Sequence, residues 1–221
     1  FEALLGKLLN ESLVVRTKKG TNVFAGLFGE VRRVHGSDAA ALYLDMVRRL
    51  FLADAPAKLR AARRKEASGE IQLRVGEAEP FAVVNVGEPA DVTKELEKAA
   101  HPEWCLVEPE ITGASLFEAL PAESCRTTML IGSRKFMEGW NCFRVSMLGI
   151  HNIGQGAGTQ IVQLFGRGVR LRGKDGSLKR FSVDKGRERP GSDIERLRVL
   201  ETISLFTVNA AYLAQFEDEV N

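Results

Sequence analysis

The spacing of apolar side chains predicts an amphipathic helix in the first quarter of the chain. Behind Ser37 or Asp38, either of which suits a helix N-cap, apolar residues recur at helical spacing at Leu42, Tyr43, Met46, Val47, Leu50 and Phe51. The segment 56–67, rich in Ala, Arg and Lys, predicts a second helix that ends at Gly69. Residues 13–34 mix short apolar runs with glycines, which indicates short strands and turns.

Short apolar runs in the middle of the chain predict the strands of a sheet. Turn-forming or polar segments separate these runs, which we expect at residues 71–75, 81–86, 105–108, 127–132 and 144–150. The run at 81–86 consists mainly of β-forming apolar residues, so we expect that strand to be buried on both faces. A polar helix follows it and continues through Lys98. Alternating strands and helices predict an α/β fold with a parallel sheet flanked by helices.

The last third of the chain predicts two helices and a hairpin. Apolar residues indicate a helix over 158–168, and the segment 169–181 predicts a β-hairpin with Asp-Gly at its turn. A capping box at residues 192–195 starts a closing helix whose apolar face reaches Ile203.

Composition is that of a soluble globular protein, with 44% hydrophobic and 27% charged residues and a net charge of +2. No run approaches the roughly 18 apolar residues of a membrane span, and no signal peptide is visible. Three scattered cysteines show neither zinc-site spacing nor a disulfide framework, which predicts a cytoplasmic location. Nine basic side chains against three acidic ones lie between Arg167 and Arg189. They suit phosphate binding, although a solvated basic hairpin explains them equally well.

Four residues near the predicted helix at 158–168 form the pattern Gln-x-x-Gly-Arg-x-x-Arg, namely Gln163, Gly166, Arg167 and Arg170. Two arginines three positions apart project from one face of a helix or tight turn. Their guanidinium groups match the geometry of phosphate oxygens. Gly166 removes a side chain where the backbone must come close to a ligand. An arginine supplied across an interface raises the rate of phosphoryl transfer by about 10³–10⁵-fold, so these residue types suit the stabilisation of charge on a transferred phosphoryl group.

A second pattern comes before the first, directly after the predicted strand at 127–132. Ser133 stands eight positions before Asn141, and Gly139 stands two positions before it. Arg134 and Lys135 beside the serine suit contacts with a nucleic-acid backbone.

Together, in order and separation, the two patterns resemble motifs V and VI of superfamily 2 DEAD/DEAH-type helicases. Residues 69–216 look most similar to the helicase (Res) subunit of type III restriction enzymes. The resemblance implies that residues 69–221 are the C-terminal RecA-like domain of a longer protein, with an added β-hairpin and helical segments. Residues 1–68 would then be a linker or a helical insertion.

The resemblance also implies roles for the individual residues. Arg170 would be the arginine finger, Arg167 its partner on the γ-phosphate, and Gln163 a link between the nucleotide and the interdomain cleft. Gly139, Asn141 and Gly166 would lie at the bound nucleotide, whereas Ser133, Arg134 and Lys135 would contact nucleic acid. Asn141 departs from the family pattern, which usually has Asp, and this puts its role at the ribose in doubt.

The parts of an ATP site that bind Mg²⁺ are absent from the sequence. Gly168-x-x-x-x-Gly173-Lys174 approaches a phosphate-binding loop, but Asp175 stands where the Mg²⁺-binding hydroxyl is needed. We therefore expect ATP and Mg²⁺ to be bound mainly by a first RecA-like domain and the chain alone to be inactive.

The chain's other expected contacts follow from the resemblance and from the remaining residues. We expect the first RecA-like domain and DNA as partners, with RNA as an alternative, and a methyltransferase or another defence subunit. The three histidines are far apart in the sequence, so we expect no metal site. We also expect no contact with a membrane. Glu108 and Glu110 lack a neighbouring lysine in the arrangement of a restriction nuclease, so any nuclease is expected elsewhere. A module that binds nucleic acid or a protein without ATP is the alternative function.

Overall fold

The computed structural model describes residues 2–16, 20–22, 24–67, 69–86, 88–99, 105–132, 142, 144–151, 166 and 201–208. Contacts divide the chain into two units. The first comprises Phe1–Phe117 and Ser124–Ile131, and the second Glu118–Glu123 and Gly132–Asn221. Among the described residues, no helix is long and apolar enough to cross a membrane.

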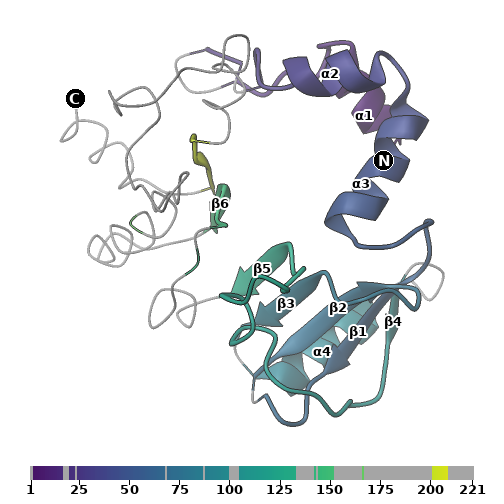
Figure 1. Cartoon of the computed structure of the whole chain (residues 1–221), viewed down its shortest axis with the longest axis vertical. Coiled ribbons are helices and arrows are strands. Elements are labelled where there is room, and N and C mark those ends of the chain that lie inside the picture. The colour runs from purple at the N-terminus through teal and green to yellow at the C-terminus, as the bar shows by residue number, and fades with distance from the viewer. Residues whose placement is uncertain are drawn as a thin grey trace. The chain divides into compact units, whose positions relative to one another are not determined.

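Three helices at the start of the first unit pack around a small apolar core (Figure 1). They are α1 (Glu2–Leu9), α2 (Gly29–His35) and α3 (Ala39–Leu50). The buried centre consists of Leu5, Leu9 and Leu42. In residues 13–34, where strands and turns were predicted, the described part contains α2 and an isolated antiparallel bridge between Arg16 and Asn22.

Helix α3 confirms the helix predicted from apolar spacing, and Asp38 rather than Ser37 caps it. The Asp38 carboxylate accepts a hydrogen bond from the backbone N–H of Ala41 at 2.9 Å. This satisfies one of the backbone donors that a helix leaves open at its first turn.

Replacing the cap gives a first prediction. Asp38→Ala should destabilise α3 by about 1 kcal/mol, because the amide of Ala41 loses its acceptor. Faster hydrogen exchange of the Ala41 amide would report the loss. Ser37→Ala, one position earlier and exposed, is the control. Equal exchange rates in the two variants would contradict the cap.

The sheet of the first unit has five strands in the order β4-β1-β2-β3-β5. They are β1 (Leu59–Arg63), β2 (Ile71–Val75), β3 (Ala82–Asn85), β4 (Cys105–Val107) and β5 (Met129–Gly132). Strands β2 to β5 confirm four predicted strands. Strand β1 pairs antiparallel with β2, β2 antiparallel with β3, and β1 parallel with β4.

The sheet is therefore mixed, and the prediction of a parallel sheet is wrong for the pairs β1–β2 and β2–β3. Short connections join these three strands along the chain. A parallel pair needs a crossover of about a dozen residues or more, whereas a short turn can join only antiparallel neighbours.

Strand β1 replaces the helix that was predicted over residues 56–67. Ala and Arg favour helix in an isolated peptide, but Ala61 and Ala62 are fully buried here, on opposite faces of the strand. The guanidinium groups of Arg60 and Arg64 bind side chains of other segments. Partners distant in the sequence thus decide the conformation of this segment.

Both faces of β3 are covered. On one face, Val92 and Leu96 of α4 (Pro89–Ala99) pack against the cluster of Ala61, Ile71 and Val84. On the other face, Val83 is completely buried. The expectation that this strand is buried on both faces is confirmed, and the architecture is α/β.

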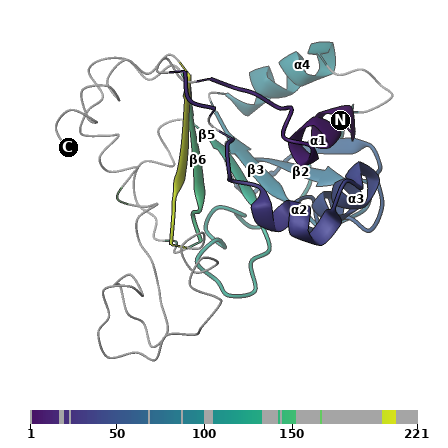
Figure 2. The same cartoon turned by 90° about the horizontal axis from the view of Figure 1, so that it is seen from above.

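The second unit contains two parallel strands, β6 (Met147–His151) and β7 (Ser204–Val208). Figure 2 shows them side by side, β7 in yellow. Strand β6 confirms the strand predicted at 144–150, but β7 was not predicted, and Ile203 just before it is not helical. The predicted hairpin at 169–181 and nearly all of the two predicted helices lie outside the described residues.

Candidate functional site

Nearly all residues of the predicted nucleotide and nucleic-acid sites lie outside the described part of the chain. These are Ser133, Arg134, Lys135, Gly139, Asn141, Gln163, Arg167 and Arg170. Gly166 is described, and it is helical and partly buried.

The described strands nevertheless show which elements come before and after the two patterns along the chain. Strand β5 ends at Gly132, so Ser133 is the first residue beyond its carboxyl end. The Gln-x-x-Gly-Arg-x-x-Arg pattern lies in residues 152–203, which connect β6 to β7. Because β6 and β7 are parallel, this connection must cross from the end of one strand to the start of the other.

An arginine–glutamate cluster lies on the five-stranded sheet and consists of Arg60, Arg74, Glu77 and Glu108. Arg60 and Arg74 are directly opposite each other on β1 and β2. Glu108 follows β4 and accepts hydrogen bonds from Arg60 Nη1 at 2.7 Å and from Arg74 Nη2 at 3.0 Å. Glu77 follows β2 and binds Arg60 Nη2 at 2.8 Å and Arg74 Nη1 at 2.9 Å.

The two carboxylates of this cluster differ in exposure and in their electrostatics. The side chain of Glu108 is 12% exposed, whereas that of Glu77 is 72% exposed. Burial raises the pKa of Glu108, but the hydrogen bonds and charges of Arg60 and Arg74 outweigh burial and lower this pKa below its ordinary value. The hydrogen bond to Glu108 likewise raises the pKa of Arg74. Glu108 is therefore a structural anion between two cations.

A second polar group lies around the buried carboxylate of Glu70. This carboxylate accepts hydrogen bonds from Ser115 Oγ and from the backbone N–H of Leu116. Arg64 donates to Gln72 Oε1 at 2.5 Å and to the carbonyl oxygen of Ala114 at 2.8 Å. These contacts fasten the segment after β4 to the sheet. Because these contacts hold chain segments together, we assign this group a structural role.

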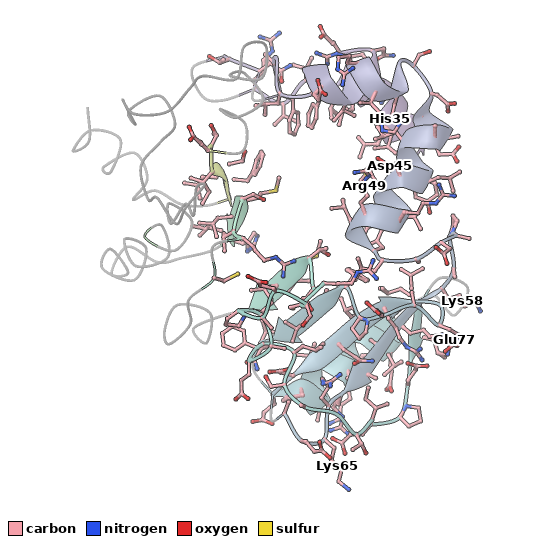
Figure 3. The ribbon with its side chains drawn as sticks, in the orientation of Figure 1. His35, Asp45, Arg49, Lys58, Lys65 and Glu77 are labelled. Carbon is pink, nitrogen blue, oxygen red and sulfur yellow. The ribbon has the colours of Figure 1, made fainter. Side chains whose placement is uncertain are left out.

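A third polar group joins α2 to α3. Figure 3 shows His35, Asp45 and Arg49 in a row from the end of α2 along α3. Asp45 lies 3.4 Å from His35 Nε2 and 2.7 Å from Arg49 Nε. The hydrogen bond from Arg49 lowers the pKa of Asp45 below its ordinary value. The group links two helices and includes no nucleophile.

An open hollow of about 290 Å³ lies in the first unit between α3 and the sheet. Its walls are apolar, and the edge-to-face contact of Phe51 with Phe81 forms part of them. The residues that line it are Tyr43, Val47, Phe51, Pro56, Ala57, Leu59, Leu73, Val75, Phe81 and Met129. Its lining contains no charged side chain that could pair with a phosphate.

The sequence analysis missed the arginine–glutamate cluster. A signal for it exists in β2, where Arg74 interrupts an otherwise apolar end of the strand, but only the pairing of β1 with β2 reveals its partner. In the part of the chain that the structure describes, no group of His, Cys, Asp and Glu side chains could hold a metal ion.

No protein-family model matches the chain, and neither a curated protein nor a solved structure matches it.

Proposed function

We propose that this chain is the second RecA-like motor domain of an ATP-dependent helicase or translocase that acts on DNA, in a restriction or other defence system. One observation carries the proposal: the two motif-like patterns occur in the sequence in the order and at the separation found in these helicases. Ligands of open α/β sheets bind beyond the carboxyl ends of the strands. Ser133 comes directly after the carboxyl end of β5, and Arg167 and Arg170 lie in the crossover between β6 and β7.

The chain's contribution to ATP hydrolysis would be cationic. Gln163, Arg167 and Arg170 offer amide and guanidinium donors, which fit phosphate oxygens and not a metal ion. Mg²⁺, bound by the first RecA-like domain, would neutralise charge on the phosphates. Arg167 and Arg170 would approach the γ-phosphate from the opposite side and stabilise the charge of the transition state.

The same geometry would couple hydrolysis to movement along DNA. ATP would draw the two RecA-like domains together because it bridges the first domain and the arginines of the second. Ser133, with Arg134 and Lys135, would hold backbone phosphates, so that closing and opening of the cleft would shift these contacts along a strand. The mixed five-stranded sheet with helices on it is compatible with the α/β fold that the proposal requires.

The chain alone should hydrolyse no ATP, whereas the complete protein should hydrolyse ATP faster when DNA is added. The physical reason is that the chain would supply arginines for the γ-phosphate, whereas its sequence has neither the phosphate-binding loop nor the acidic motif that together bind Mg·ATP. Phosphate release by the two proteins, with and without DNA, measures the difference. A complete protein that binds DNA but never hydrolyses ATP would favour the ATP-independent binding module instead.

A further inference from the structure

We propose that Arg60 and Arg74 form a binding site for a phosphate group, which the carboxylate of Glu77 covers. The phosphate would be free inorganic phosphate or a phosphate of a nucleic-acid backbone. This site contains none of the motif residues, so it can be tested independently of the proposed ATP hydrolysis.

The two arginines are fixed side by side by the strand pairing. Arg60 on β1 is the direct partner of Arg74 on β2 in the antiparallel register. Like charges in such a cross-strand pair repel each other, so the pair needs anions close to it. Glu108 provides one negative charge from the end of β4, and with two arginines this leaves one positive charge to be balanced.

Glu77 occupies the position of an external anion. One of its oxygens lies 2.8 Å from Arg60 Nη2 and the other lies 2.9 Å from Arg74 Nη1. Two oxygens of one phosphate could bridge the same two guanidinium groups, because carboxylate and phosphate present similar pairs of acceptors to arginine. The carboxylate of Glu77 is therefore a stand-in for the ligand that we propose.

Exposure decides which carboxylate can leave. The side chain of Glu77 is 72% exposed and lies in the turn after β2, so its ion pairs are screened by water and contribute little to stability. Glu108 is only 12% exposed, so it would stay bound to both arginines and keep them aligned when Glu77 leaves. The ligand would therefore meet the Nη atoms of the two arginines that Glu77 now binds, because Arg60 Nε is buried.

Further positive charge lies near this end of the sheet. Figure 3 shows Lys58 and Glu77 at the same end and Lys65 at the opposite end. Lys58 is exposed and comes directly before β1, so it adds to the attraction of an anion to Arg60 and Arg74.

Titration of the isotope-labelled 221-residue chain with inorganic phosphate, at low and constant ionic strength, tests the site. The signals to follow are the Nε–H groups of Arg60 and Arg74. Glu77→Gln keeps the size of the side chain but removes the competing charge, so it should raise the affinity for phosphate by roughly five-fold. Glu79→Gln is the matched control, because Glu79 lies close by in the same connection, is 63% exposed and pairs with Arg126 outside the cluster.

A short DNA oligonucleotide, added in place of phosphate, separates the two sources of the ligand. Shifts of the same two Nε–H signals by DNA, larger in Glu77→Gln, identify backbone phosphates as the ligand. Shifts by inorganic phosphate alone identify a small free anion. The proposal is overturned if neither probe shifts these signals, or if Glu77→Gln binds no more tightly than the wild type or than Glu79→Gln.

Discussion

Arg170→Ala in the complete protein is expected to lower DNA-stimulated ATP hydrolysis by about 10³-fold or more, without loss of ATP binding. If Arg170 is the arginine finger, its guanidinium acts on the charge that develops on the transferred phosphoryl group. An interaction made mainly in the transition state raises the turnover rate much more than it raises the affinity for the substrate. Single-turnover hydrolysis, measured beside nucleotide binding, separates the two quantities.

Two further variants make this test specific. Arg172→Ala removes an arginine from the same basic run, two positions beyond the pattern, and should change hydrolysis only slightly. Arg170→Lys keeps the charge but loses the planar fork of donors, so it should recover little of the activity. Equal losses in Arg170→Ala and Arg172→Ala would show that general basic charge, and not an arginine finger, supports hydrolysis.

The elements that the sequence predicts well are those whose signal is local. Helix α3 has its cap in Asp38 and its apolar face within its own twelve residues. Strand β3 is a compact apolar run, and its first three residues are buried. In both cases the segment itself contains the information that decides its structure.

The elements that were missed depend on partners far away in the sequence. Strand β1 has the composition of a helix, and it is a strand because β2 and β4 pair with it on either side. Strand β7 follows a predicted helix, and its partner β6 lies more than fifty residues earlier in the chain. Strand direction was also missed, because apolar runs do not reveal whether their neighbours are parallel.

The two candidate sites differ in the same way. The residues of the proposed ATP site can be named only from the sequence, because Arg167 and Arg170 belong to a linear pattern and lie outside the described residues. The arginine–glutamate cluster can be named only from the structure, since two of its members lie on strands β1 and β2 and the other two lie in the segments that follow β2 and β4. The arginines in the sequences of β1 and β2 do not reveal the cluster until the strand register places Arg60 opposite Arg74.

Glu108→Ala is expected to lower the free energy of unfolding by about 3 kcal/mol, because it leaves two partly buried guanidinium groups with only the exposed Glu77 as a counter-charge. Urea unfolding of the chain at neutral pH measures this. Glu110→Ala is the matched control, since Glu110 is exposed and only two positions further on. It should change the free energy of unfolding by less than about 0.5 kcal/mol.

The pH dependence of this difference tests its electrostatic origin. The pKa of Glu108 is lower in the folded chain than the ordinary value of a glutamate, about 4.3 in unfolded peptides. Glu108 therefore contributes its full stabilisation above that value, and this contribution is lost as the pH falls through the lower pKa of the folded state. The difference in the free energy of unfolding between the wild type and Glu108→Ala should be largest near neutral pH and should become smaller in acid below about pH 4. A difference that stays constant in acid would mean that Glu108 stabilises the sheet by packing. Its negative charge would then not be what allows the two arginines to lie close together.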